Sequence, residues 1–327
     1  MSSPRIQNES GCRSPGSVHD SGMPRPRPLP VQLDESGFAV RDAIASGVSR
    51  RRLRAADLRA PFHGVRARTA AVDARARARA YAPRLRPGEA FSHGTALELV
   101  DVAVPSGNDT NVHVTSVGGR ERSRGRSVRG HEAAEGLLRV GVVAGLPAVH
   151  PIDAWCQLGA TLTVRQLVVI GDALTRRKHP IATRSELAAA VESWAPRRGV
   201  RSLRRAMALV RENTDSQQET ELRLDAADAG LPEPEVNGVI LDERGRFVAY
   251  GDLVYREYRT LLEYDGEQHR LDDRQFARDV GRLDDLARLG WRVVRVTKQH
   301  RGAQRSERLE RVRESLMSRG WVPVPPP

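Results

Sequence analysis

The sequence is short of cysteine and has no long apolar run. Its only cysteines, Cys12 and Cys156, lie far apart and neither belongs to a CxxC pair, which argues against a disulfide framework and a cysteine zinc site. No apolar run approaches the roughly 18 residues that span a bilayer. The N-terminus lacks the apolar core of a secretory signal. We therefore expect a reduced, cytoplasmic protein that does not enter the membrane.

Lysine is also scarce, although the chain is strongly basic. Lysine and arginine together number 53 against 41 acidic residues, for a net charge of +12, and all but Lys178 and Lys298 are arginine. Such a surplus favours a polyanionic partner, with nucleic acid ahead of an anionic membrane. An arginine-rich chain also results from GC-rich coding, so charge alone leaves nucleic-acid binding open.

The 327 residues are enough for two or three domains, because one core usually spans roughly 100–200 residues. The pattern of apolar and turn residues predicts an α+β chain with an α/β unit at its C-terminal end. The expected parts are a disordered tail (1–30, with Met1 or Met23 as the start), a winged-helix domain (31–87), an α+β connecting domain (88–215), a sheet flanked by helices (216–320) and a Pro-rich tail (321–327).

The basic segment after the tail has helix-turn-helix spacing. A first helix is expected to end at Gly47, and Ser49 is expected to cap a second helix that continues to about Arg59. The stretch "HGVRART" after Pro61 alternates like a short strand, as a wing would. Four arginines would lie on the first turns of the second helix, where side chains and N-terminal amides reach phosphates: Arg50, Arg51, Arg52 and Arg54. The alternative is that they only solvate a surface helix.

The stretch "SGVSRRRLRAADL", followed by "FHGVRA", resembles the N-terminal winged-helix domain of AbiEi-type antitoxins. The resemblance covers about forty residues of the chain. It implies a DNA-binding domain, and it leaves open a toxin–antitoxin partner and a homodimer.

The middle region shows no identifiable chemistry. We expect a helix at "FSHGTALELV", a strand at "NVHVTSV", an arginine-rich connector at "RSVRGHEA", and then a series of helices. The region contains five histidines without metal-ligand spacing, so we interpret them as surface or packing residues: His93, His113, His131, His150 and His179.

The C-terminal region alternates strands and helices around a hairpin, "GDLVYREYRTLLEYDG". If its turn is centred between Glu257 and Tyr258, antiparallel pairing places Asp252 opposite Glu263. Side chains alternate along a strand, so Asp265 shares a face with Glu263. Three carboxylates within roughly 5–7 Å repel one another unless a cation lies between them. Oxygen ligands without cysteine select Mg²⁺ or Mn²⁺.

Neighbouring residues extend this predicted metal site. Glu219, on the preceding helix, is placed to add a carboxylate or to hold a metal-bound water. His269, after the Asp265–Gly266 turn, is a candidate acid/base or phosphate contact. Arg278 and Arg282 on the following helix are candidate phosphate contacts. Taken singly, each acid also fits an edge-strand charge or a solvated strand face.

The run "QETELR…GDLVY…LLEYDGEQHR…FARDVGRLDDLARLGWRVVRVT" resembles the family related to very-short-patch-repair (Vsr) endonucleases, within the PD-(D/E)XK nuclease superfamily. The resemblance covers roughly residues 216–319. It implies that Asp252 is the motif aspartate and that Glu263 is the acidic residue of the (D/E)XK strand. Glu219 matches the helical glutamate and His269 the histidine after the turn. Asp265 stands where the superfamily has its lysine.

The resemblances together imply a metal-dependent DNA endonuclease coupled to a DNA-binding winged helix. Asp252, Glu263 and Asp265 would then hold the metal ion. The rival expectation is an antitoxin-like DNA-binding regulator whose nuclease fold has lost turnover, because an aspartate cannot stabilise negative charge as the lysine would. RNA in place of DNA stays open.

Overall fold

The computed structural model describes residues 26–105, 109–118, 121–265, 273–300 and 302–323, with the side chains of residues 273–279 left out. The chain has the α+β architecture expected from its sequence. Within the described residues, no helix has the length and apolar character needed to cross a membrane. The segments 1–25 and 324–327, which include both candidate start methionines, fall outside the described residues.

The N-terminal part is small and has its own apolar core. It contains β1 (Phe38–Ala39), α1 (Val40–Ala45), the 3₁₀ turn η1 (Arg52–Arg54) and β2 (Val65–Arg66), which pairs antiparallel with β1. Phe38, Ala43, Val48 and Leu53 form the core. The first helix ends as predicted, because Gly47 follows it with a φ of +84°, a left-handed conformation that favours glycine.

The prediction of a second helix from Ser49 to about Arg59 is wrong. Ser49 does accept a hydrogen bond from the amide of Arg52, but only the single turn η1 forms. The chain then turns back, and Arg59 pairs with Ala67 in an isolated β-bridge. The Arg66 guanidinium donates to the carbonyl of Leu53, the middle residue of that turn. These tertiary hydrogen bonds replace the helical ones that local sequence favoured.

The middle part contains a six-stranded mixed sheet with the order β5-β6-β4-β3-β8-β7. The segment "RSVRGHEA", predicted as a connector, instead contains strand β6, which pairs in parallel with β4 over its whole length. The elements are α2 (Ala74–Tyr81), η2 (Ala82–Arg84), β3 (Glu89–Phe91), α3 (His93–Glu98), β4 (Val112–Val117), β5 (Arg124–Gly125), β6 (Val128–Ala133), β7 (Val140–Val143) and β8 (Leu146–Val149).

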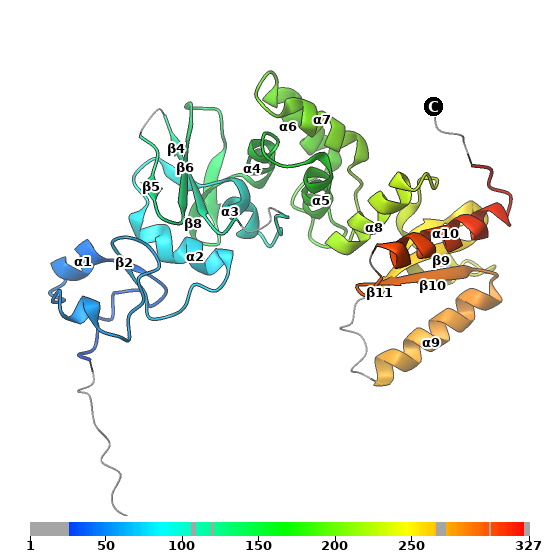
Figure 1. Ribbon diagram of the computed structural model, residues 1–327, viewed down its shortest axis with the longest axis horizontal. Coiled ribbons are helices and arrows are strands. Elements are labelled where there is room, and N and C mark those ends of the chain that lie inside the picture. Colours follow the sequence, from blue (N-terminus) through cyan, green and yellow to red (C-terminus); the bar gives the residue numbers. More distant parts are fainter. Residues whose placement is uncertain (1–25, 106–108, 119–120, 266–272, 301, 324–327) are drawn as a thin grey trace, which may run out of the picture.

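Four helices follow this sheet and lie between it and the C-terminal part (Figure 1). They are α4 (Pro151–Leu158), α5 (Val164–Leu174), α6 (Arg184–Trp194) and α7 (Val200–Leu209). Capping boxes at Thr163 and Thr183 start α5 and α6. Trp155 is fully buried among these helices and donates its indole N–H to the carbonyl of Leu167. One core extends from Phe62 through this helical group.

The C-terminal part has the predicted order of elements. They are α8 (Gln217–Asp228), β9 (Glu235–Leu241), β10 (Phe247–Tyr255), η3 (Arg256–Tyr258), β11 (Thr260–Asp265), α9 (Asp273–Arg288), β12 (Arg292–Thr297) and α10 (Ala303–Met317). The sheet order is β12-β11-β10-β9, with β12 parallel to β11 and the other pairs antiparallel. Figure 1 shows α9 and α10 on opposite faces of this sheet. Apolar residues fill both faces.

Candidate functional sites

The predicted register of the C-terminal hairpin is confirmed. Leu253 pairs with Leu262, and Tyr255 pairs with Thr260, so the pairing is symmetric about the predicted turn centre between Glu257 and Tyr258. Continuing that register by one step places Asp252 opposite Glu263. By alternation both acids share the sheet face of Val254 and Leu261, which packs beneath α9. The sequence was informative here because the short turn leaves the pairing no freedom.

Asp252 lies in an unfavourable place for a negative charge. Burial raises the pKa of its carboxyl to about 7, and the nearby charges of Glu219 and Glu263 add to that effect. One contact lowers the Asp252 pKa instead, because the amide of Tyr264 donates a hydrogen bond to Asp252 Oδ2 over 2.8 Å. Asp252 therefore lies close to two of the predicted site acids, Glu219 and Glu263.

Glu263 and Asp265 both have arginine partners. The Arg282 guanidinium donates to the two Glu263 oxygens over 2.7 and 3.0 Å, and the Glu263 side chain is only 8% exposed. Arg282 lies on α9 and is predicted to contact phosphate. In the structure it contacts the Glu263 carboxylate on β11. Arg295 on β12 lies 3.0 Å from Asp265. A cation that binds Glu263 has to compete with Arg282.

Glu219 is buried and occupies the first turn of α8. Its carboxylate accepts hydrogen bonds from the Asp215 amide, the Ser216 hydroxyl and the Asn237 side-chain amide. The residue therefore caps its own helix as well as lying close to Asp252. These contacts hold the Glu219 carboxylate in place.

His269 lies outside the described residues, and so does the side chain of Arg278, although its backbone belongs to α9.

The predicted DNA-binding arginines divide into two groups. Arg52 is largely covered, because it forms a bidentate ion pair with Asp57 and its side chain is only 10% exposed. Arg50, Arg51 and Arg54 are exposed around the single turn η1. They form a basic surface without the recognition helix that the sequence favoured.

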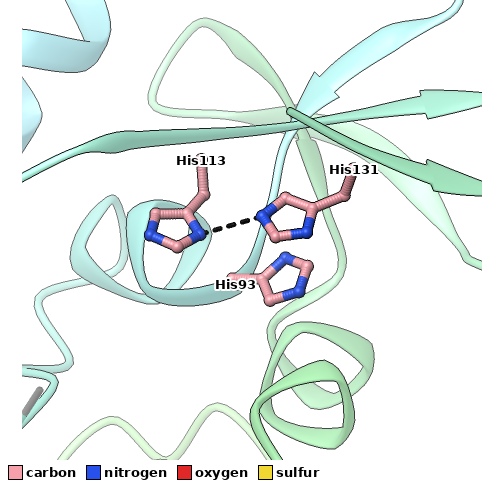
Figure 2. A group of neighbouring side chains, drawn as sticks. All are labelled: His93, His113 and His131. Carbon is pink, nitrogen blue, oxygen red and sulfur yellow. Dashed lines mark hydrogen bonds between the residues drawn. The ribbon is translucent and has the colours of Figure 1, made fainter. Parts of the chain in front are cut away.

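Three of the five middle-region histidines come together, which the sequence interpretation missed. Within the described residues, His93, His113 and His131 are the only three metal-ligating side chains whose ligand atoms all lie within 4.8 Å of one another. Figure 2 shows the rings gathered between α3 and the strands, with His113 turned toward His131. Nδ1 of His113 lies 3.0 Å from Nε2 of His131, and the His93 ring stacks on His131 with a centroid distance of 3.8 Å.

Parallel pairing of β4 with β6 explains this meeting. His131 pairs with Thr115, and Thr115 lies two residues after His113, so both histidines point from the same face. α3 packs against β4 and brings His93 to that face. The three histidines are widely separated in sequence, so no local motif could have identified the cluster. The sequence signal that existed was the apolar alternation of β4.

Burial keeps the three imidazoles neutral. It lowers the pKa of His93 to about 2 and that of His131 to about 4, and neighbouring imidazoles add to both shifts. The pKa of His113 is also lowered by burial, although Asp109 opposes that effect. Neutral imidazole is the form that binds metal ions.

Comparison with known proteins identifies relatives but no activity. Two proteins from strains of Mycobacterium tuberculosis (CDC 1551 / Oshkosh and ATCC 25618 / H37Rv), both described as uncharacterized, are 28% identical over 188 residues. The aligned part covers 57% of this chain and 67% of each relative. No family model matches the sequence.

Proposed function

We propose that the protein is a metal-dependent endonuclease that hydrolyses phosphodiester bonds in DNA, with its site on the C-terminal sheet. The observation that carries the proposal is the hairpin register, which ends at Leu253 paired with Leu262 and, continued by one step, sets Asp252 across from Glu263 beside an apolar face. Glu219 lies close enough to Asp252 to disfavour its charged form. Acids in such a place cost stability, and ionisable groups with perturbed pKa values cluster at functional sites.

The chemistry of the carboxylates suits a hard divalent ion, although among the described residues only the three histidines already form a group of three ligands close enough for one ion. Asp252 and Glu263 supply oxygen donors and no sulfur, which suits Mg²⁺ or Mn²⁺. Glu219 lies near Asp252, and Asp265 follows Glu263 by two residues on β11. When bound, such an ion polarises a phosphoryl oxygen and lowers the pKa of a bound water. The chain itself fixes Asp252 through the Tyr264 amide and fixes Glu219 through three hydrogen bonds. The exposed arginines near η1 would contribute DNA affinity.

Nicking of supercoiled plasmid by the full chain tests this function. We expect activity that requires Mg²⁺ or Mn²⁺, and a loss of roughly 100-fold or more in Asp252→Ala, because one metal ligand is removed. Asp284→Ala, which removes an exposed carboxylate from α9, is the matched control and should nick like the wild type. Equal nicking by Asp252→Ala and wild type, in nuclease-free preparations, would overturn the proposal. A labelled RNA duplex in parallel reactions separates RNA from DNA cleavage.

The second candidate is an antitoxin-like DNA-binding regulator with an inactive nuclease fold. Two ion pairs favour it. Arg282 pairs with Glu263 and Arg295 pairs with Asp265, so the arginines compensate both carboxylate charges without a metal ion. Calorimetric titration of Mg²⁺ and Mn²⁺ into wild type and Glu263→Gln separates the two candidates. Metal binding that Glu263→Gln weakens, together with nicking, supports the enzyme. Retardation of DNA without metal binding or nicking supports the regulator, with or without a toxin as its partner.

A further inference from the structure

We infer that His93, His113 and His131 form a binding site for a divalent transition-metal ion of the zinc class, with one coordination position facing a cleft. The site is separate from the carboxylates of the C-terminal sheet and does not depend on their function. It belongs to the six-stranded sheet and to α3. Three imidazoles without a thiolate suit zinc, and sites of this kind leave a fourth position for water or another ligand.

The spacing of the nitrogens supports this inference. A tetrahedral zinc ion with bonds of about 2.0–2.1 Å holds its ligand nitrogens about 3.3 Å apart. Nδ1 of His113 and Nε2 of His131 are 3.0 Å apart, and the three rings have ligand atoms within 4.8 Å of one another. Small side-chain rotations are therefore sufficient to surround an ion.

The tautomer of His113 is already the one a metal ion requires. Oδ2 of Asp109 lies 3.2 Å from Nε2 of His113, so that nitrogen carries the proton and Nδ1 presents its lone pair toward His131. Without an ion, His131 Nε2–H donates to this lone pair. With an ion, the His131 proton moves to its Nδ1 through solvent, and both imidazoles remain neutral. A carboxylate behind a ligating histidine is the usual outer partner of such sites.

Further hydrogen bonds fix Asp109 and the backbone of His93 and His113. Asp109 accepts from the Asn111 amide over 3.0 Å and from its side-chain nitrogen over 2.7 Å. The His113 amide donates to Thr95 Oγ1 over 2.9 Å. The His93 amide donates to Gln157 Oε1 over 3.1 Å, and His93 has a φ of +50°. A left-handed backbone costs energy in a residue that is not glycine, and such positions cluster at functional sites.

The cluster opens onto a cleft of about 410 Å³ that reaches from α3 to β6. Its lining includes the three histidines, the carboxylates of Glu98 and Asp109, and the guanidinium of Arg129. The cleft gives a metal ion an entry path and gives the fourth coordination position access to water or a small anion beside Arg129. A packing cluster of histidines would need no such opening.

Titration of tag-free, chelator-treated full chain with Zn²⁺ and Co²⁺ tests the site. We expect one ion per chain, visible absorption bands of nitrogen-ligated Co²⁺, and a higher melting temperature with Zn²⁺. His131→Ala should weaken zinc binding by about 100-fold or more. Asp109→Asn, which keeps all three imidazoles, should weaken it by about 10–100-fold.

Two controls separate this site from other causes of binding. His63→Ala removes an exposed histidine from another part of the chain and should bind zinc as the wild type does. Plasmid nicking by the same His131→Ala sample, which keeps Asp252 and Glu263, distinguishes failure of this site from failure of the proposed nuclease site. Absence of stoichiometric zinc binding in the wild type, or unchanged binding in both His131→Ala and Asp109→Asn, overturns the inference and leaves a packing cluster.

Discussion

Replacing Asp252 by Asn is expected to stabilise the protein at pH 8 and to leave its stability at pH 4 almost unchanged. An unfolded aspartate has a pKa near 3.8, and burial with the charges of Glu219 and Glu263 raises the folded value to about 7. Between these values the folded state binds more protons, so stability falls as pH rises from about 4 to about 7 and is then constant. The full penalty is on the order of 4 kcal/mol. Asparagine carries no charge, and its oxygen can still accept the hydrogen bond from Tyr264.

Chemical denaturation at a series of pH values measures this effect. The difference between Asp252→Asn and wild type should grow through the range in which the carboxyl ionises. Asp284→Asn, on the exposed face of α9, should follow the wild type at every pH. If the free energies of unfolding of Asp252→Asn and wild type change in parallel with pH, the Asp252 pKa is not raised in the folded state and the prediction is wrong. If the carboxylates hold a cation, Mg²⁺ should stabilise the wild type at pH 8 more than it stabilises Asp252→Asn.

Replacing Arg223 by Leu is expected to destabilise the protein by about 3–5 kcal/mol. Arg223 on α8 lies 2.8 Å from Asp172 on α5, and the two side chains are 2% and 0% exposed. Without the guanidinium, Asp172 would keep only the hydrogen bonds from Thr220 and from the Arg211 amide. Its pKa is raised by burial even in the intact pair. Leaving the buried Asp172 carboxylate without its cation therefore lowers the free energy of unfolding by much more than an exposed ion pair raises it.

The double variant Asp172→Leu/Arg223→Leu provides the decisive comparison. It should be less destabilised than Arg223→Leu, since no buried charge remains and the energies of contacting residues do not add. Arg204→Leu breaks the exposed pair with Glu192 and should change stability little. Urea denaturation followed by circular dichroism gives all four values. An Arg223→Leu variant as stable as Arg204→Leu would mean that the pair does not join α5 to α8.

This pair also shows how the middle and C-terminal parts are connected. α5 packs against α8, and Arg165 of α5 forms further ion pairs with Asp225 and Asp228 of α8. Loss of the Asp172–Arg223 pair is therefore expected to loosen the contact between the two parts before either core unfolds. Hydrogen exchange of the α8 amides would detect that loosening.

The C-terminal site could be predicted well because its geometry is local. A short turn at Glu257 and Tyr258 sets the pairing of the two strands, so the position of Asp252 across from Glu263 needs no knowledge of distant residues. The partners of these acids could not be predicted. Arg282 lies 19 residues beyond Glu263, and α9 must pack on the sheet before the two can meet.

The N-terminal arginines show the opposite outcome. Local propensity favoured a second helix after Ser49, but hydrogen bonds from Arg66 to Leu53 and between Arg59 and Ala67 hold the chain in one turn and a reversal. Helix propensity is worth only tenths of a kcal/mol per residue. Tertiary contacts of this kind outweigh it readily.

The sequence by itself determined the α+β class, the order of elements in the C-terminal part and the acids that cross the hairpin. These features depend on hydrophobic period, turn residues and short-range pairing, which are all local. Only the tertiary structure decided that His93, His113 and His131 meet, that "RSVRGHEA" contains a strand, and that Arg282 pairs with Glu263. Each of these depends on parallel pairing or on helix packing between distant segments, where the register is set by the whole core.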